Sequence, residues 1–172
     1  HLANLAIRSG CQIQRLLVAL RSYGAPLRVL DLQRNCLLPP LPDDIVDPQA
    51  WLASTPETDD FNEWCDTTLA ALAEVCNWIE TEGNCLSRLT LSHTMEMPTE
   101  ATSRRSVGAV LEALRNLAVR RLCAALGSEN CVLTDIALHD FGFSPDNVEL
   151  LAPPLRRPGC ALTSVRLSDW AM

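Results

Sequence analysis

The chain has 172 residues, of which 48% are apolar and 20% charged, a composition that is typical of globular proteins and excludes wholesale disorder. Its formal net charge of −7 argues against direct binding of nucleic acids or anionic membranes, because both are bound through basic surfaces. No run approaches the ~18 uninterrupted apolar residues of a membrane span. We therefore predict one domain over residues 1–172.

A short leucine-rich pattern, L-x-x-L-x-L with Ile or Val allowed, recurs along the chain and predicts strands. The matches are Leu2-Leu5-Ile7, Leu27-Leu30-Leu32, Leu86-Leu89-Leu91, Leu133-Ile136-Leu138 and Leu162-Val165-Leu167. Glycine stands shortly before four of them, at Gly24, Gly83, Gly127 and Gly159. A helix often ends with a residue in the left-handed conformation, which glycine adopts without cost, so each of these glycines is predicted to end a helix.

Segments with apolar residues at helical spacing lie between the matches. The three long ones run over 13–20, 61–79 and 107–126. Asp60 and Glu63 form a plausible capping box at the start of the second. A fourth, short helix is predicted to begin at Ser144 and to be broken by Pro153 and Pro154. The predicted unit is strand, turn, helix, glycine and the next strand, which indicates the α/β class.

Residues 38–60 interrupt this order with five of the 11 prolines and six acidic residues. Such a composition propagates neither a helix nor a central strand and predicts a long insertion loop. One interpretation is a partner-binding arm whose apolar anchors are Ile45, Val46, Trp51 and Leu52. The alternative is that these side chains merely cover the end of the neighbouring repeat.

The chain resembles the leucine-rich repeat family, in particular its ribonuclease-inhibitor-like subtype. The segments that resemble it are LRVLDLQRNCL, CLSRLTLSHTM, CVLTDIALHDFGF and CALTSVRLSDWAM, with helices between the strands. The resemblance implies a solenoid of about five irregular repeats, with parallel strands on the concave side and helices on the convex side. Asn35 is the only Asn at the family's ladder position, so a side-chain ladder there is expected to be mostly absent. The alternative fold is a helical bundle in which the strand pattern arises by chance.

Catalytic and metal-binding motifs are absent from the sequence. It contains no GxSxG, HExxH, phosphate-binding glycine loop or dinucleotide fingerprint, and no CxxC or Cys–His pair at zinc spacing. We therefore predict no enzyme, no cofactor, no metal and no small-molecule substrate. The remaining catalytic hypothesis is a base at His139, oriented by Asp135 or Asp140. Most of the eight cysteines lie in apolar stretches, which predicts reduced, buried thiols and an intracellular protein.

Residues between the core leucines of each strand are expected to point away from the core, because side chains alternate along a strand. Those predicted to bind a partner on this concave face are Arg8, Asp31, Gln33, Arg88, Thr90, Ser92, Asp135, His139, Arg166 and Ser168. The row is small, polar and of mixed sign. The predicted function is a non-enzymatic protein–protein interaction scaffold, one subunit of a larger intracellular assembly. The alternative is a substrate-recognition module of a ubiquitin-ligase-type complex.

The last repeat predicts a second contact surface at its C-terminal edge. A terminal repeat leaves one strand edge and one side of its core open. We expect Trp170, Met172 and the flank of Leu167 to be covered by another polypeptide or by residues beyond Met172. The same argument applies less strongly before Leu2.

Overall fold

Strands alternate with helices in the computed structural model, which describes residues 10–33, 69–92, 104–139, 141, 143 and 147–168. The elements in chain order are α1 (Gly10–Ser22), β1 (Val29–Leu32), α4 (Ala70–Glu80), β2 (Arg88–Ser92), α5 (Arg104–Leu126), β3 (Asp135–His139), the 3₁₀ helix η1 (Val148–Leu151), α6 (Ala152–Arg156) and β4 (Ser164–Ser168). The first predicted strand at 2–7, the capping box at Asp60 and Glu63, and the insertion at 38–60 lie outside the described residues.

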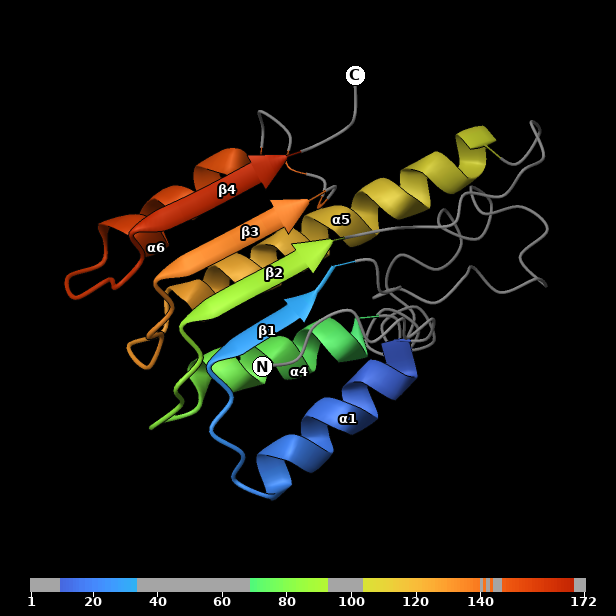
Figure 1. Cartoon of the computed structure of the whole chain (residues 1–172). Helices are drawn as coiled ribbons and strands as arrows, with labels where there is room; N and C mark the ends of the chain where they lie inside the picture. Colours follow the sequence, from blue (N-terminus) through green and yellow to red (C-terminus); the bar gives the residue numbers. More distant parts are fainter. Residues whose placement is uncertain are drawn as a thin grey trace.

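The described strands form one parallel sheet in the order β1-β2-β3-β4, which is also their order along the chain (Figure 1). The fold is therefore α/β, and the helical-bundle alternative is wrong. The register aligns equivalent positions of the leucine-rich pattern. Leu30, Leu89, Ile136 and Val165 make one row across the sheet, and the second row is Leu32, Leu91, Leu138 and Leu167.

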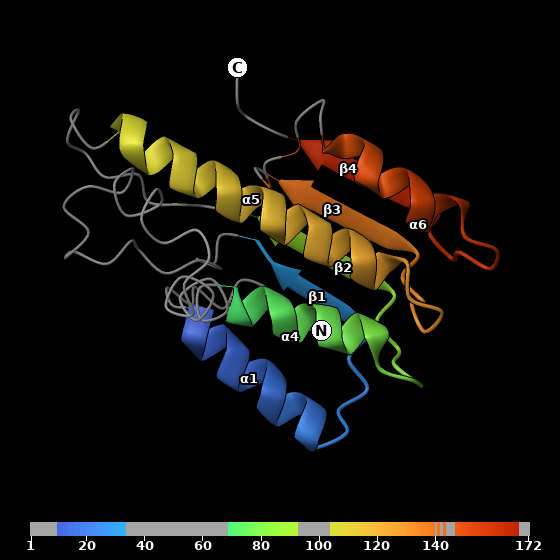
Figure 2. The same ribbon diagram turned by 180° about the vertical axis from the view of Figure 1, so that it is seen from behind.

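The helices α1, α4, α5 and α6 all lie on one face of this sheet, as the two opposite views show (Figures 1 and 2). The core is formed where the two leucine-rich rows meet the apolar sides of these helices. Leu30, Leu89 and Ile136 are 0% exposed, and so are Val119 and Leu122 on α5. The pattern residues of β1, β2 and β3 face the helices and are buried at every second position, which is the two-residue period expected from the sequence. Ala137 and Ser92, which lie between or beside them, are buried as well.

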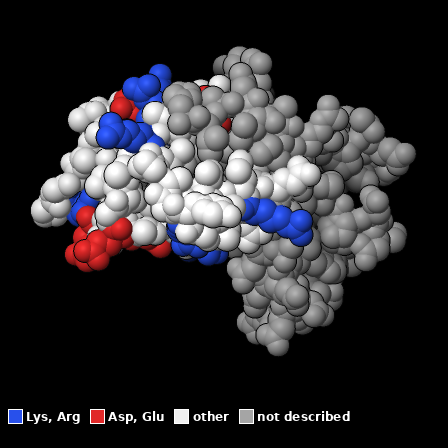
Figure 3. Space-filling model, turned by 60° about the horizontal axis from the view of Figure 1, so that its bottom comes forward, with Lys and Arg blue, Asp and Glu red and all other residues white. Residues whose placement is uncertain are grey.

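The sheet is covered by α1 and α4 at its β1 end. Trp78 of α4 is buried and its Nε1–H donates to the carbonyl of Leu17 in α1 at 3.3 Å. Arg21 Nη2 lies 2.9 Å from Oε1 of the buried Glu74, whose Oε2 accepts a hydrogen bond from Asn77. Seen from this end, the described surface is mostly uncharged, with acidic side chains grouped at one corner (Figure 3). The hydrogen bond from Trp78 and the ion pair between Arg21 and Glu74 hold α1 against α4.

Each of the four predicted glycines closely follows a helix, but α4 and α6 already leave the helical conformation at Thr81 and Arg157. Gly83 and Gly159 therefore lie in the turn beyond the helix end. Gly24, Gly83 and Gly159 have φ values of 63°, 73° and 79°, in the left-handed region. Gly127 directly follows Leu126, the last residue of α5, as predicted, but its φ is not positive. Its N–H instead donates to the carbonyls of Cys123 and Ala124, at 3.1 and 3.0 Å, so the last turn of α5 tightens without a left-handed residue.

The sequence predicts that the two adjacent prolines break the last helix, but in the structure they lie at its start. Pro153 and Pro154 stand in the first turn of α6, which follows η1 directly. The N–H groups of the first turn have no partner inside a helix, so the missing N–H of proline costs nothing there. Proline near a helix start therefore has the opposite effect to proline in its middle.

A ladder of polar contacts joins successive strands just before they begin. Equivalent hydroxyls donate to the carbonyl of the preceding repeat, with Ser87 bonded to Arg28, Thr134 to Ser87 and Thr163 to Thr134, at 3.1, 3.0 and 3.1 Å. The side-chain amide of Asn84 likewise donates to the carbonyl of Asn130 at 2.8 Å. The leucine-rich pattern does not predict this ladder, because Ser87, Thr134 and Thr163 lie between its positions. These bonds hold the strands in the register that aligns the leucines.

Candidate protein-binding surface

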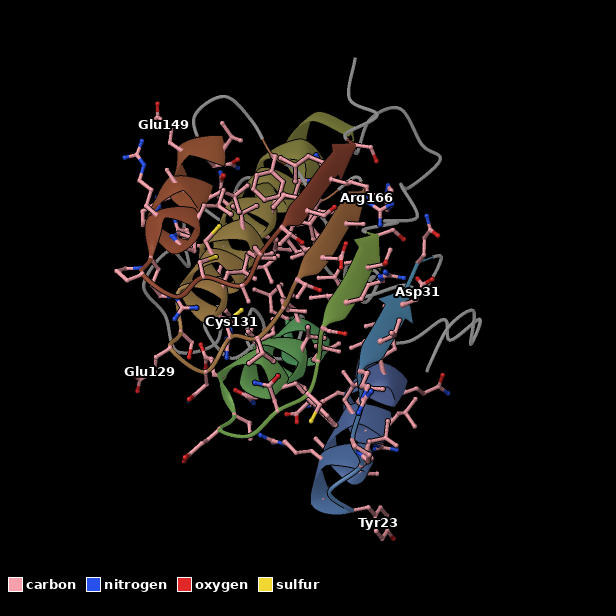
Figure 4. The ribbon with its side chains drawn as sticks, turned by 60° about the vertical axis from the view of Figure 1, so that its left-hand side comes forward. Tyr23, Asp31, Glu129, Cys131, Glu149 and Arg166 are labelled. Atoms are coloured by element: carbon pink, nitrogen blue, oxygen red, sulfur yellow. The ribbon has the colours of Figure 1, made fainter. Side chains whose placement is uncertain are left out.

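The face of the sheet that the helices leave uncovered presents three rows of side chains, which we call the open face. The rows are Val29, Arg88, Asp135 and Ser164; then Asp31, Thr90, Ala137 and Arg166; then Ser92, His139 and Ser168. Asp31 and Arg166 lie on the side of the sheet away from α5 and α6 (Figure 4). The strand order therefore brings together predicted partner-binding residues from four separate segments of the chain.

The side chains predicted to bind a partner on the open face differ in their solvent exposure. Arg88 and Arg166 are exposed, and most of the others are half-buried, namely Asp31, Gln33, Thr90, Asp135, His139 and Ser168. Ser92 is 5% exposed, and the neighbouring Ala137 is 3% exposed. Ser92 is thus part of the packed structure in the free chain. Arg8 lies outside the described residues.

The polar groups of the open face are held by short local contacts. Asp31 accepts a hydrogen bond from the backbone N–H of Gln33 at 2.9 Å, and Thr134 Oγ1 lies 2.9 Å from Oδ2 of Asp135. His139 Nδ1 and Ser168 Oγ form a hydrogen bond between β3 and β4. The face is therefore a fixed, mixed-sign surface, with two arginines and two aspartates in its first two rows.

The catalytic hypothesis for His139 fails for one of its two carboxylates. Asp135 and His139 are four residues apart on β3, which separates their Cα atoms by about 13 Å at ~3.3 Å per residue. Asp135 therefore cannot orient the imidazole ring. Asp140 lies outside the described residues.

A groove of about 660 Å³ lies between α5 and the η1–α6 segment on the helical side. Its lining residues are Arg120, Cys123, Ala124, Gly127, Leu150, Pro153, Pro154 and Arg157. Arg157 Nη2 donates to the carbonyl of Cys131 at 3.4 Å, while its Nε is buried without a partner. No sequence pattern predicts this groove, because α5 and α6 become neighbours only through the order of the strands.

The outer edge of β4 differs from the rest of the sheet in burial. Leu167 is 40% exposed, whereas its register equivalents Leu32, Leu91 and Leu138 are 0–1% exposed. Val165 is likewise only partly buried. Trp170 and Met172, which were predicted to contribute to this edge, lie outside the described residues, as do the insertion anchors Ile45, Val46, Trp51 and Leu52.

The five cysteines whose side chains the structure describes are free thiols in three environments. Cys76, Cys123 and Cys131 are buried, Cys160 is half-buried and Cys85 is exposed. Burial raises the pKa of the Cys76 thiol from 9.0 to about 12 and that of Cys123 to about 11. Burial also raises the pKa of Cys131. Within the described residues, no group of three His, Cys, Asp or Glu side chains could hold a metal ion.

We expect iodoacetamide at about pH 8 to alkylate Cys85 at least 100-fold faster than Cys76 in the native protein, because the thiolate is the reacting species. Mass spectrometry of the modified peptides, sampled over time, measures both rates. In denaturing urea the two rates should converge, which serves as the control. Equal native rates would contradict the burial of Cys76.

Since the native thiol of Cys76 keeps its proton to about pH 12 and an unfolded one loses it near 9.0, the free energy of unfolding should fall as pH rises above 9.

Comparison of the chain with family models, with curated proteins and with solved structures finds no match. None of the helices in the described ranges combines the length and the hydropathy that crossing a membrane requires. The surfaces above are therefore interpreted from their own geometry.

Proposed function

We propose that the protein is a non-enzymatic scaffold of the leucine-rich repeat type that binds another protein through its open face, within a larger intracellular assembly. The observation on which this depends is the uncovered face of a parallel sheet whose strands follow chain order. The register-aligned leucines and the hydroxyl ladder between successive strands support a repeated unit. Stacked units that contact only their neighbours are the arrangement of solenoid proteins, and these two features support it.

The chemistry of the open face favours a protein as the partner. Its exposed and half-buried side chains combine Arg88 and Arg166 with Asp31 and Asp135, so neither charge dominates. A nucleic-acid surface needs a predominance of basic residues, which this face lacks in its described part. Protein interfaces, in contrast, match charges of both signs across a broad, water-accessible rim.

Affinity capture with the whole chain tests this function. Thr90 lies in the middle row of the open face and is half-buried, so Thr90→Arg places a long charged side chain at its centre. Proteins captured by the natural chain should fall about tenfold or more in quantitative mass spectrometry with this variant. Ser22→Arg, at an exposed position at the end of α1, is the matched control and should retain them.

Capture that Thr90→Arg leaves unchanged would contradict binding through the open face. Circular dichroism and urea unfolding of both variants establish that any loss is not a loss of folding. The ligase-type recognition module is a more specific form of the same proposal. Nothing in the described residues favours it over a general scaffold, and it stays a prediction.

A further inference from the structure

We propose that the outer edge of β4, which we call the free edge, binds an extended strand of a partner protein whose residues alternate between apolar and acidic. This site is separate from the centre of the open face and can be occupied without it. Backbone direction, burial and charge at β4 all favour such a partner.

The backbone of β4 leaves hydrogen-bonding groups unused at this edge. Ser164 donates its N–H to the carbonyl of Thr134 at 3.1 Å, so Ser164, Arg166 and Ser168 direct their backbone groups toward β3. Because these directions alternate along a parallel strand, the N–H and C=O groups of Val165 and Leu167 point outward. In the described part of the chain, β4 pairs with β3 alone.

The hydroxyl ladder also stops at this edge. The carbonyls of Arg28, Ser87 and Thr134 each accept hydrogen bonds from the next repeat. No residue in the described ranges donates to the carbonyl of Thr163, which is the next equivalent acceptor. One further strand would therefore continue both the sheet and the ladder.

The side chains of β4 determine what such a strand must contain. On the helix-facing side, the exposed Leu167 and partly buried Val165 lack, among the described residues, the apolar neighbour that their equivalents have on the next strand, so every second residue of the partner is apolar. On the other side, Arg166 is exposed and has no ion pair within the described residues. The intervening residues of the partner are therefore acidic.

Charge argues against a second copy of this chain as the occupant. Two β4 strands paired antiparallel over their full length place Val165 opposite Leu167 of the other copy and Arg166 directly opposite Arg166, and any other register shortens the pairing. Like charges directly opposite each other destabilise a strand pair. An acidic strand removes this repulsion and pairs the guanidinium instead.

The probe is a fluorescently labelled peptide of alternating valine and glutamate, compared with one of alternating valine and lysine. Fluorescence anisotropy with the whole chain should detect binding of the valine–glutamate peptide and weaker binding of the other. Amide hydrogen exchange followed by NMR gives the location. The N–H groups of Val165 and Leu167 should gain protection from exchange, whereas those of Ser164 and Arg166 are protected beforehand by β3.

Two variants and one control test the residues. Arg166→Glu should weaken binding of the valine–glutamate peptide about tenfold and strengthen binding of the valine–lysine peptide. Leu167→Lys, at a position that is already 40% exposed, should abolish binding of both, since an edge lysine opposes strand addition. Arg15→Glu is the matched control, because it reverses an exposed charge on α1, at the β1 end of the sheet and outside both proposed surfaces, and should leave the affinity within about twofold.

Absence of binding would overturn the proposal, as would binding that protects other amides or that ignores both β4 variants. Analytical sedimentation of the chain without peptide measures whether two copies pair through the free edge. A dimer that Leu167→Lys dissociates would assign the free edge to a second copy and also overturn it. Loss of open-face capture in Thr90→Arg has no bearing on these outcomes, so the two proposals fail separately.

Discussion

Replacing Leu91 by alanine is expected to lower the free energy of unfolding by about 2–5 kcal/mol. Leu91 is 0% exposed on the helix-facing side of β2 and lies between Leu32 and Leu138 in the register. Removing its side chain therefore loses buried apolar surface and leaves a cavity between strands that cannot close without breaking the register. Urea unfolding followed by circular dichroism measures the change as a lower midpoint at unchanged slope.

Leu167→Ala is the matched control, since it removes the same side chain from the equivalent position of β4. Leu167 is 40% exposed, so the same substitution should cost less than about 1 kcal/mol. Equal losses in the two variants would mean that the side chain of Leu167 is covered in solution. That result would contradict the exposure on which the free-edge proposal depends.

Trp78→Ala is expected to cost about 3–5 kcal/mol, because the indole is the largest buried side chain where α4 meets α1. Trp78 is 5% exposed, and its removal leaves a cavity between two closely packed helices. The indole also provides the hydrogen bond to Leu17. Thermal or urea unfolding of the variant measures the combined loss.

Trp78→Phe separates packing from hydrogen bonding at this contact. The phenyl ring keeps most of the packing but donates no hydrogen bond. Leu17 O lies inside α1, where the N–H four residues later also bonds to it, so its carbonyl is not left without a partner. We therefore expect this variant to lose only about 1–2 kcal/mol. A loss as large as that of Trp78→Ala would show that the hydrogen bond, rather than the ring, provides the stability.

The core of the sheet was predictable because alternation along a strand depends on local sequence alone. Leu30, Leu89 and Ile136 occupy predicted pattern positions and are all fully buried. The hydroxyl ladder was not predictable in this way. Ser87 and Arg28 are 59 residues apart, and their contact depends on a register that only the folded sheet defines.

The candidate surfaces also combine features that follow from local sequence with features that only the folded structure defines. The orientation of Asp31 and Arg166 away from the helices follows from the two-residue period, and the structure places both as expected. The burial of Ser92 does not follow from that period, because it depends on what lies above the strand rather than within it. Likewise, Arg120 and Arg157 line one groove only because consecutive strands bring α5 and α6 together.

The nearest-neighbour order of the elements has a consequence for local unfolding. Packing contacts join β1 to β2, β2 to β3, β3 to β4, and each helix mainly to the next, so the chain is stabilised by a series of adjoining interfaces. The unit of η1, α6 and β4 has a neighbour on one side only within the described residues. It can therefore detach while β1, β2 and β3 stay folded, at a smaller free energy than global unfolding. Detachment of this unit would make β3 the unpaired edge strand of the sheet and would expose Ile136 and Leu138.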